Sequence, residues 1–447
     1  MPISRKIIFN RLERLRVEDT KNGKLLLLSL FIGILSGLLS SVFRFFLTSI
    51  ENFHEHWIQL GQESGLWSIL GLILATSTSI FIAFWLVRKY APEAGGSGIQ
   101  EIEGALDGVR PLRWKRVIPV KFFGSLFSLG SGLLLGREGP TVQLGASVGK
   151  MVKDVSKHPD YGNNPLISAG AAAGLAGAFN APLSGIIFVI EEMNGHFKFN
   201  FYNLASIMIG AGISDVVVRI ILGSEVSLPL GITSEWEMTY LWLFPVLGVF
   251  IGAIGWVYNQ VILLSLDAFK KYQNHIVLTS LFLGVLVVSV TIFSPYLSGA
   301  GYNTIHQLVQ NNYSLTFLLL LLTGRFILSI VSYGSGLPGG LFTPMLTLGI
   351  IMGLIFGVLA EIVLPGSVSE KGIFAIAGMA ALFSSTVRAP LTGLVLAVEM
   401  TSNYGLILPL ILCTAAASVM TTMLGNRPIY SVLLERVLNP DLSQEDS

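Results

Sequence analysis

The stretch GSGLLLGREGP, residues 130–140, places an arginine and a glutamate side by side in an otherwise apolar, glycine-rich segment. A charged side chain inside a bilayer is costly, and where one is retained it usually marks a transport pathway or a proton relay. Whether Arg137 and Glu138 have such a role depends on whether this segment lies in a membrane.

The composition indicates that it does. The chain has 447 residues, of which 52% are hydrophobic and only 12% are charged, whereas soluble domains carry about 25% charged residues. Apolar stretches of about 20 residues, long enough to cross a bilayer, recur at 25–47, 66–86, 201–222, 241–265, 276–293, 315–330 and 406–424. A β-barrel would instead show segments of about ten residues with alternating polarity. The sequence therefore predicts an all-α polytopic membrane protein.

The charge distribution predicts the orientation. Residues 1–24 are polar and basic and directly precede the first apolar stretch, so the positive-inside rule predicts a cytoplasmic N-terminus in a cell (inner) membrane. An amphipathic helix on the lipid surface is compatible with the same topology. No cleavable signal peptide is predicted, and the short tail 439–447 is not expected to form a regulatory domain. The net charge of +1 gives no indication of a nucleic-acid partner.

No metal or cofactor is predicted. The six histidines show none of the spacings that hold a metal ion. The only cysteine, Cys413, lies in an apolar run, where packing is its expected role.

Two pairs of segments indicate an internal duplication. GSGLLLGREGP aligns without gaps on GSGLPGGLFTP (334–344), and NAPLSGIIFVIEE (180–192) aligns on RAPLTGLVLAVEM (388–400). The offsets, 204 and 208, are nearly equal, and the order is the same. With a boundary in the polar loop 228–238, the predicted membrane repeats are 25–232 and 233–438.

Both glycine-rich copies adjoin apolar stretches that we expect to be too short to span a membrane alone. Such broken helices are tolerated at membrane depth only where the freed backbone is buried in protein or lines a cavity. Glycine lets backbone N–H groups approach a ligand closely, and a helix N-terminus adds unpaired N–H donors and a partial positive charge. With a third glycine-rich stretch at 91–106, the sequence predicts an anion site made of dipoles, weak enough to release its ion.

Four motifs then resemble a known family. They are GSGIQ (96–100), GREGP (136–140), GGLFTP (339–344) and NRPIYS (426–431). They look like the anion-pathway signatures of the CLC family of chloride channels and proton/chloride antiporters, in family order. The resemblance extends from about residue 25 to 438 and is strongest to short bacterial antiporters without CBS domains. It implies inverted repeats with many short, broken and tilted helices, and a homodimer with one pathway per subunit.

The resemblance also implies roles for individual residues. Ser97 and Tyr430 would contact a central chloride through their hydroxyls, and Leu341 and Phe342 through backbone N–H groups, while the backbone around Glu138 would form an outer site. The implied chloride-binding residues are Ser97, Gly98, Ile99, Arg137, Glu138, Gly139, Leu341, Phe342 and Tyr430.

Two glutamates would carry the proton chemistry. Glu138 would be the gating glutamate, whose carboxylate occupies an anion position when ionised and swings out when protonated. Glu192 would transfer protons internally near the cytoplasmic side. In the repeat alignment Glu399 corresponds to Glu191, whereas Met400 replaces Glu192, so only one half keeps an acid at the proton position.

Other charged residues have simpler expected roles. Arg137 is expected to pair away from the pore and support its loop. Lys121 is expected to be a loop or helix-end charge, or else to pair with a buried acid. Glu101 and Glu103 are expected to be loop and helix-end charges. The chain departs from the family at Gln100, where proline is usual.

The favoured function is proton-coupled chloride antiport, and the alternative is a passive chloride channel of the same fold. A fluoride exporter fits less well, because those members depart from the serine and tyrosine motifs present here. An intramembrane enzyme is disfavoured, since the sequence has no Ser–His pair at rhomboid-like spacing, no GxGD aspartate and no zinc motif. A structural scaffold would not need three anion-cradling loops.

Overall fold

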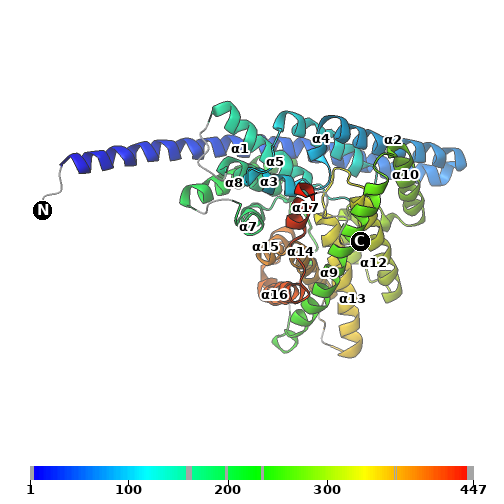
Figure 1. The fold of residues 1–447 in the computed structure, drawn as a ribbon. Coiled ribbons are helices and arrows are strands. Elements are labelled where there is room, and N and C mark those ends of the chain that lie inside the picture. The colour runs from blue at the N-terminus through cyan, green and yellow to red at the C-terminus, as the bar shows by residue number, and fades with distance from the viewer. Residues whose placement is uncertain are drawn as a thin grey trace.

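The structure is a computed structural model that describes residues 5–157, 164–196, 200–232, 236–366, 368 and 370–439, with the backbone alone for 5–22 and 60–64. The described chain is built from helices (Figure 1). These are α1 (Arg5–Ser64), α2 (Leu66–Tyr90), α3 (Ile99–Leu106), α4 (Trp114–Gly130), α5 (Glu138–Ser156), α6 (Pro165–Phe179), α7 (Pro182–Glu192), α8 (Phe201–Leu222), α9 (Leu243–Lys271), α10 (Ile276–Phe293), α11 (Tyr302–Gln310), α12 (Leu315–Gly334), α13 (Phe342–Val363), α14 (Lys371–Val387), α15 (Pro390–Thr401), α16 (Ile407–Met423) and α17 (Ile429–Leu438).

Within the described residues, eight helices are long and apolar enough to cross a membrane. Seven coincide with the predicted apolar stretches, which confirms a multi-pass membrane protein. The eighth, α13, was not predicted, and the expectation that both glycine-rich copies adjoin short stretches is wrong for the second one. The reason is the composition of the helix after each loop: α5 soon meets Lys150, Lys153 and Asp154, whereas α13 stays apolar for most of its 22 residues.

Several of the described helices are too short to span a bilayer. α3 has 8 residues, α7 has 11 and α11 has 9. Proline in the first turn, where its missing N–H costs nothing, starts α6, α7 and α15. Gly98, with φ of 88°, supplies the left-handed residue immediately before α3.

Small residues bring the central helices close together. α5 packs against α6, and α13 packs against α14. A methyl group on Gly170 would strike the backbone of Gly145, and one on Gly349 would strike the backbone of Gly378. Close approach through small residues is a common way to join helices in membranes, where apolar burial gives little advantage. Cys413 is fully buried in α16, as expected.

The segments that align in sequence also meet in space. The N–H of Gly136 donates to the carbonyl of Gly340 at 2.7 Å, and the N–H of Gly340 donates back to Gly136 at 2.7 Å. These bonds form an isolated antiparallel bridge. The chain therefore runs in opposite directions through the two glycine loops. The division into segments 1–24, 25–232, 233–438 and 439–447 stays a prediction.

A second reciprocal contact joins α7 and α15. Glu191, near the end of α7, accepts hydrogen bonds from the N–H groups of Leu391 and Thr392 at 3.0 and 2.7 Å. Glu399, near the end of α15, accepts from the N–H groups of Leu183 and Ser184 at 3.0 and 2.7 Å. Each glutamate thus caps the start of the other helix, and the two helices lie antiparallel.

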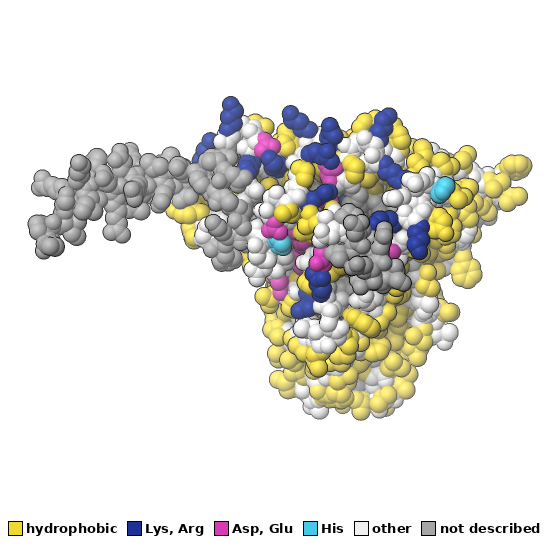
Figure 2. All heavy atoms as spheres, in the orientation of Figure 1, with side chains coloured by type: hydrophobic (Ala, Val, Ile, Leu, Met, Phe, Trp, Pro, Cys, Tyr) yellow, Lys and Arg dark blue, Asp and Glu magenta, His cyan; other side chains and the backbone are white. Residues whose placement is uncertain are grey.

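Charged side chains are unevenly distributed on the face shown in Figure 2. Lys and Arg side chains gather in its upper part, around α3, α4, α5 and α17, whereas the lower part is mostly apolar. Such a distribution fits a protein with one charged end in water and an apolar body in lipid.

Candidate ion-binding site

Three glycine-rich loops are hydrogen-bonded to one another at the centre of the molecule. Besides the bridge between Gly136 and Gly340, the N–H of Gly96 donates to Gly336 at 3.2 Å, and the N–H of Gly339 donates to Gly96 at 3.0 Å. These loops lead into α3, α5 and α13, so the starts of three helices converge. The first N–H groups of each helix have no acceptor within the helix and favour an anion.

Two buried hydroxyls complete this centre. Ser97, just before α3, and Tyr430, in the first turn of α17, are both 0% exposed. The two hydroxyls lie close enough to interact with each other, but neither makes a hydrogen bond of normal geometry to any described residue. Buried polar groups are nearly always hydrogen-bonded. The two hydroxyls are therefore suited to a small polar ligand.

The other predicted anion contacts surround the same point. Gly98 and the buried Ile99 form the start of α3, and Gly139, in the first turn of α5, packs against Ser97. Leu341 and Phe342 form the start of α13 and are buried.

The ring of Phe342 belongs to an aromatic cluster. Its centroid lies 4.8 Å from that of Phe383, 5.6 Å from Phe188, 6.3 Å from Tyr430 and 6.4 Å from Phe179. Packing on several sides fixes the ring and hence the backbone at the start of α13.

Lys121 holds the Ser97 loop in a way that the sequence did not predict. Its Nζ donates to the carbonyls of Ala94, Gly96 and Ser97 at 3.1, 2.7 and 3.1 Å. The expected pairing with a buried acid is wrong, because the carbonyls of this sharply turned loop point at the ammonium group. Gln100 lies in the first turn of α3. The three hydrogen bonds from Lys121 therefore fix the loop although Gln100 stands where the resemblance led us to expect proline.

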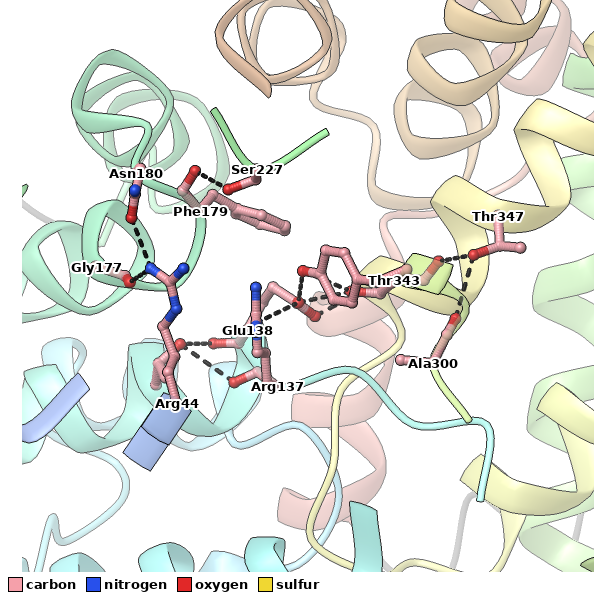
Figure 3. A network of polar contacts seen from close by, with 12 residues as sticks. Arg44, Arg137, Glu138, Gly177, Phe179, Asn180, Ser227, Ala300, Thr343 and Thr347 are labelled. Atoms are coloured by element: carbon pink, nitrogen blue, oxygen red, sulfur yellow. Dashed lines mark hydrogen bonds and ion pairs between the residues drawn. The ribbon is translucent and has the colours of Figure 1, made fainter. Parts of the chain in front are cut away.

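Glu138 is fully buried and well supplied with donors (Figure 3). Its Oε1 accepts from the Tyr302 hydroxyl at 2.8 Å and from the Thr343 hydroxyl at 2.6 Å. Its Oε2 lies 3.4 Å from the Thr343 N–H, in the first turn of α13. The carboxylate therefore occupies a position where a helix start and two hydroxyls would receive an anion.

Arg137 does not point away from this centre, and the expectation that it would is wrong. Its guanidinium lies 4.3 Å from the centroid of the Tyr302 ring, and its Nε is 4.0 Å from Oε1 of Glu138. The face of an aromatic ring attracts a cation and offers a buried arginine a partner. Arg44, from α1, donates nearby to Gly177 and Asn180 at 3.0 and 2.6 Å (Figure 3).

The second predicted glutamate has a different environment. Glu192 ends α7, and its Oε1 is buried without a hydrogen-bond partner among the described residues. Glu103, in α3, is 0% exposed, and neither of its carboxylate oxygens has a partner there either. The charges of Glu192 and Glu103 act on each other, and Glu192 also acts on Tyr430. Glu103 is thus not an ordinary helix-end charge, and Glu101 is instead paired with Arg110 at 2.9 Å.

Two cavities approach the loops. One, of about 310 Å³, is lined by Glu51, His54, Glu55 and Tyr302 among others, and we call it the Tyr302 cavity. The other, of about 400 Å³, is lined by Gly96 and Gln100 among others, and we call it the Gly96 cavity. The first ends at a residue that contacts Glu138, and the second reaches the loop that carries Ser97.

Comparison with known proteins agrees with the motifs. The voltage gated chloride channel family matches residues 79–422. The H(+)/Cl(-) exchange transporter ClcA of Vibrio campbellii is 43% identical over 429 residues, covering 94% of this chain and 91% of the relative. The chain belongs to the CLC family. A solved slow cyanobacterial Cl-/H+ antiporter is 34% identical with a TM-score of 0.89, over 95% of this chain and 99% of that one.

The CLC fold extends to distant relatives. A eukaryotic CLC transporter is 21% identical with a TM-score of 0.78, over 92% of this chain and 73% of that one, a likeness of fold alone. The predicted family and all-helical CLC architecture are confirmed. The individual roles of the predicted site residues stay predictions.

Tyr302 and Thr343, the donors to Glu138, were missed by sequence reasoning. A weak signal was available for Tyr302, because SGIQ (97–100) aligns on AGYN (300–303) with one shared glycine at an offset of 203, close to that of the glycine-rich copies. That alignment places Tyr302 opposite Ile99, at the start of a short helix beside the anion loops. It would not have shown which way the hydroxyl points.

Proposed function

We propose that this chain exchanges chloride for protons across the membrane. The observation that carries the proposal is the position of Glu138, whose buried carboxylate lies at the start of α13 and accepts hydrogen bonds from three donors. ClcA relatives that cover nearly the whole chain are named as H(+)/Cl(-) exchange transporters.

The geometry suggests how exchange would work. An ionised carboxylate and a chloride ion accept the same N–H and O–H donors, so Glu138 and chloride compete for one position. Protonation removes the negative charge and weakens the hold of the helix dipole on the side chain. Proton entry at Glu138 and chloride occupation are thereby coupled.

Chloride would bind at the starts of the converging helices. Its contacts would be the hydroxyls of Ser97 and Tyr430, which lack partners among the described residues, and the backbone N–H groups of the surrounding loops. The proposed set is Ser97, Gly98, Ile99, Arg137, Glu138, Gly139, Leu341, Phe342 and Tyr430. Because these donors would be hydroxyls and backbone N–H groups, with Arg137 taking part through its backbone and not its guanidinium, the ion can leave.

Protons would take a separate route on the other side of Tyr430. Glu192 would pass them, and the nearby Glu103 would favour proton uptake, because two buried carboxylates disfavour a second negative charge. A passive channel is the alternative function, and the unsatisfied Glu192 favours antiport over it.

The charge distribution supports an orientation. The basic residues 1–24 precede the first span and would lie in the cytoplasm. If α1 then crosses the membrane, Glu51 and Glu55 near its far end would lie with the Tyr302 cavity on the outer side. Glu138 would then exchange protons with the outside and Glu192 with the inside.

We also propose a homodimer with one pathway per subunit, by likeness to the family. The convergence of the proposed site residues within one chain supports one pathway per subunit, and the dimer itself rests on likeness to the family. Subunit counting by stepwise photobleaching of labelled protein in liposomes would test it, and single-step bleaching throughout would contradict it.

The test of function uses purified protein in liposomes. A chloride gradient is imposed, the voltage is clamped with potassium and valinomycin, and external pH is followed. Protons driven uphill by the chloride gradient are expected. Chloride flux without coupled proton movement would establish the channel instead, and absence of both fluxes from protein shown to be folded would contradict both functions.

A further inference from the structure

We propose that Tyr302 and Thr343 form a hydroxyl latch, which holds ionised Glu138 in the anion position and sets how strongly chloride must compete. The inference rests on the proposed function, in which Glu138 and chloride share a position. Both residues act on chloride through Glu138 and are therefore positioning residues.

The latch is a convergence of three segments far apart in the chain. Glu138 begins α5, Tyr302 begins α11 and Thr343 lies in the first turn of α13. Both hydroxyls donate to the same carboxylate oxygen, Oε1, at 2.8 and 2.6 Å. The two hydroxyl oxygens are themselves only 3.3 Å apart.

This geometry distinguishes the charge states of Glu138. A carboxylate accepts hydrogen bonds at both oxygens, whereas a protonated carboxyl group must also donate one. Two hydroxyls that converge on one oxygen suit the ionised form, because hydrogen bonds to a charged acceptor are about twice as strong as neutral ones. Protonation of Glu138 therefore weakens the latch as it removes the charge.

The Tyr302 ring is held in place by a group other than Glu138. The guanidinium of Arg137 lies over the ring at 4.3 Å from its centroid, which holds the hydroxyl in line with Oε1. On its other side Tyr302 lines the Tyr302 cavity, whereas Glu138 does not. The phenol thus stands between this cavity and the carboxylate.

The charged and titratable groups around Glu138 are few among the described residues. Arg137 and Tyr302 contact it directly, and Arg44 and Glu51, both on α1, act on it through their charges. A tyrosine hydroxyl ordinarily stays protonated up to about pH 10. Across the working range the Tyr302 hydroxyl can therefore donate.

Chloride binding to purified protein in detergent tests the latch. Isothermal titration with sodium chloride at neutral pH would compare the unsubstituted chain with Tyr302→Phe and Thr343→Val, which remove one hydroxyl each. We expect either change to tighten chloride binding about tenfold, because the competing carboxylate is held less firmly. Tyr296→Phe is the matched control, since Tyr296 lines the same cavity but bonds to Tyr313 at 3.0 Å.

A double-mutant cycle separates the latch from direct chloride contact. In a Glu138→Gln background, Tyr302→Phe should leave chloride affinity unchanged, because the competing charge is gone. Weaker chloride binding in Tyr302→Phe, or an equal change in both backgrounds, would mean that the hydroxyl contacts chloride or supports the fold, and would overturn the proposal. Thr343→Ser keeps a hydroxyl and should restore the unsubstituted affinity.

The pH dependence of flux gives a second readout. Loss of donors to the ionised carboxylate favours its protonated form, so the pH at half-maximal chloride flux should rise by about one in Tyr302→Phe. An unchanged profile would contradict the latch. Chloride affinity is measurable whether or not protons are coupled, so failure of the latch and failure of the proposed antiport are told apart.

Discussion

The two proposed proton sites differ in how well their carboxylates are satisfied. Glu138 accepts three hydrogen bonds from Tyr302 and Thr343. By contrast, Glu192 has one buried oxygen without a partner among the described residues, and Glu103 has two. The hydroxyls of Ser97 and Tyr430 likewise make no hydrogen bond of normal geometry to any described residue.

The difference indicates two kinds of site. Where the protein supplies every donor, the ionised side chain itself is the best ligand, and an incoming ion must displace it. Where buried acceptors lack donors, desolvation disfavours the charged form, and protons, water or a transported ion must supply the partners. The first arrangement suits a gate and the second suits a passage.

The largest expected effect comes from substitution of Glu138, the carboxylate whose hydrogen bonds are all made within the protein. In Glu138→Gln the amide cannot take up a proton, so coupled proton flux should fall at least about a hundredfold while chloride flux continues. External pH and chloride release from liposomes measure both. Glu435→Gln, an exposed partner of Arg427, is the control and should behave as the unsubstituted chain. Continued uphill proton pumping by Glu138→Gln would contradict the gating role.

The next largest effect is expected at Glu192, whose buried oxygen has no hydrogen-bond partner among the described residues. Glu192→Gln should reduce proton flux at least about tenfold with chloride flux retained, because the amide keeps the shape of the side chain but cannot carry a proton. The ratio of protons to chloride in the same liposome assay measures the change. If that ratio stayed as in the unsubstituted chain, Glu192 would be an ordinary helix-end acid.

Removal of a hydroxyl should have opposite effects at the two sites. Tyr430→Phe removes an unsatisfied donor that would contact chloride, so chloride binding should weaken about tenfold. Tyr302→Phe should tighten it. Titration with sodium chloride compares the two variants directly. Tighter binding in Tyr430→Phe would place that hydroxyl outside the chloride contacts.

The smallest effects concern stability. Glu399→Ala leaves the N–H groups of Leu183 and Ser184 without their cap and should cost about 2 kcal/mol. Glu103→Met removes a buried carboxylate that has no partners among the described residues and should be neutral or stabilising. Melting temperatures in detergent measure both changes. A lower melting temperature for Glu103→Met than for Glu399→Ala would show that Glu103 is satisfied in the folded protein.

The class of protein and the architecture of its centre could be predicted from the sequence. Hydropathy is a property of the local chain, so seven of the eight spanning helices among the described residues were predicted. Glycine, proline and serine at fixed spacing have short-range consequences for the backbone, so the GSGIQ, GREGP and GGLFTP loops were predicted as helix starts around an anion site.

Which side chains meet could be learned only from the folded chain. Tyr302 and Thr343 reach Glu138 across 164 and 205 residues, and no local propensity specifies such a contact. The loop carbonyls that turn toward Lys121, and the proximity of Glu103 to Glu192, likewise result from how helices pack. Sequence patterns indicate which segments are buried and where helices begin. The direction of a buried polar side chain depends on donors and acceptors brought there by distant parts of the chain.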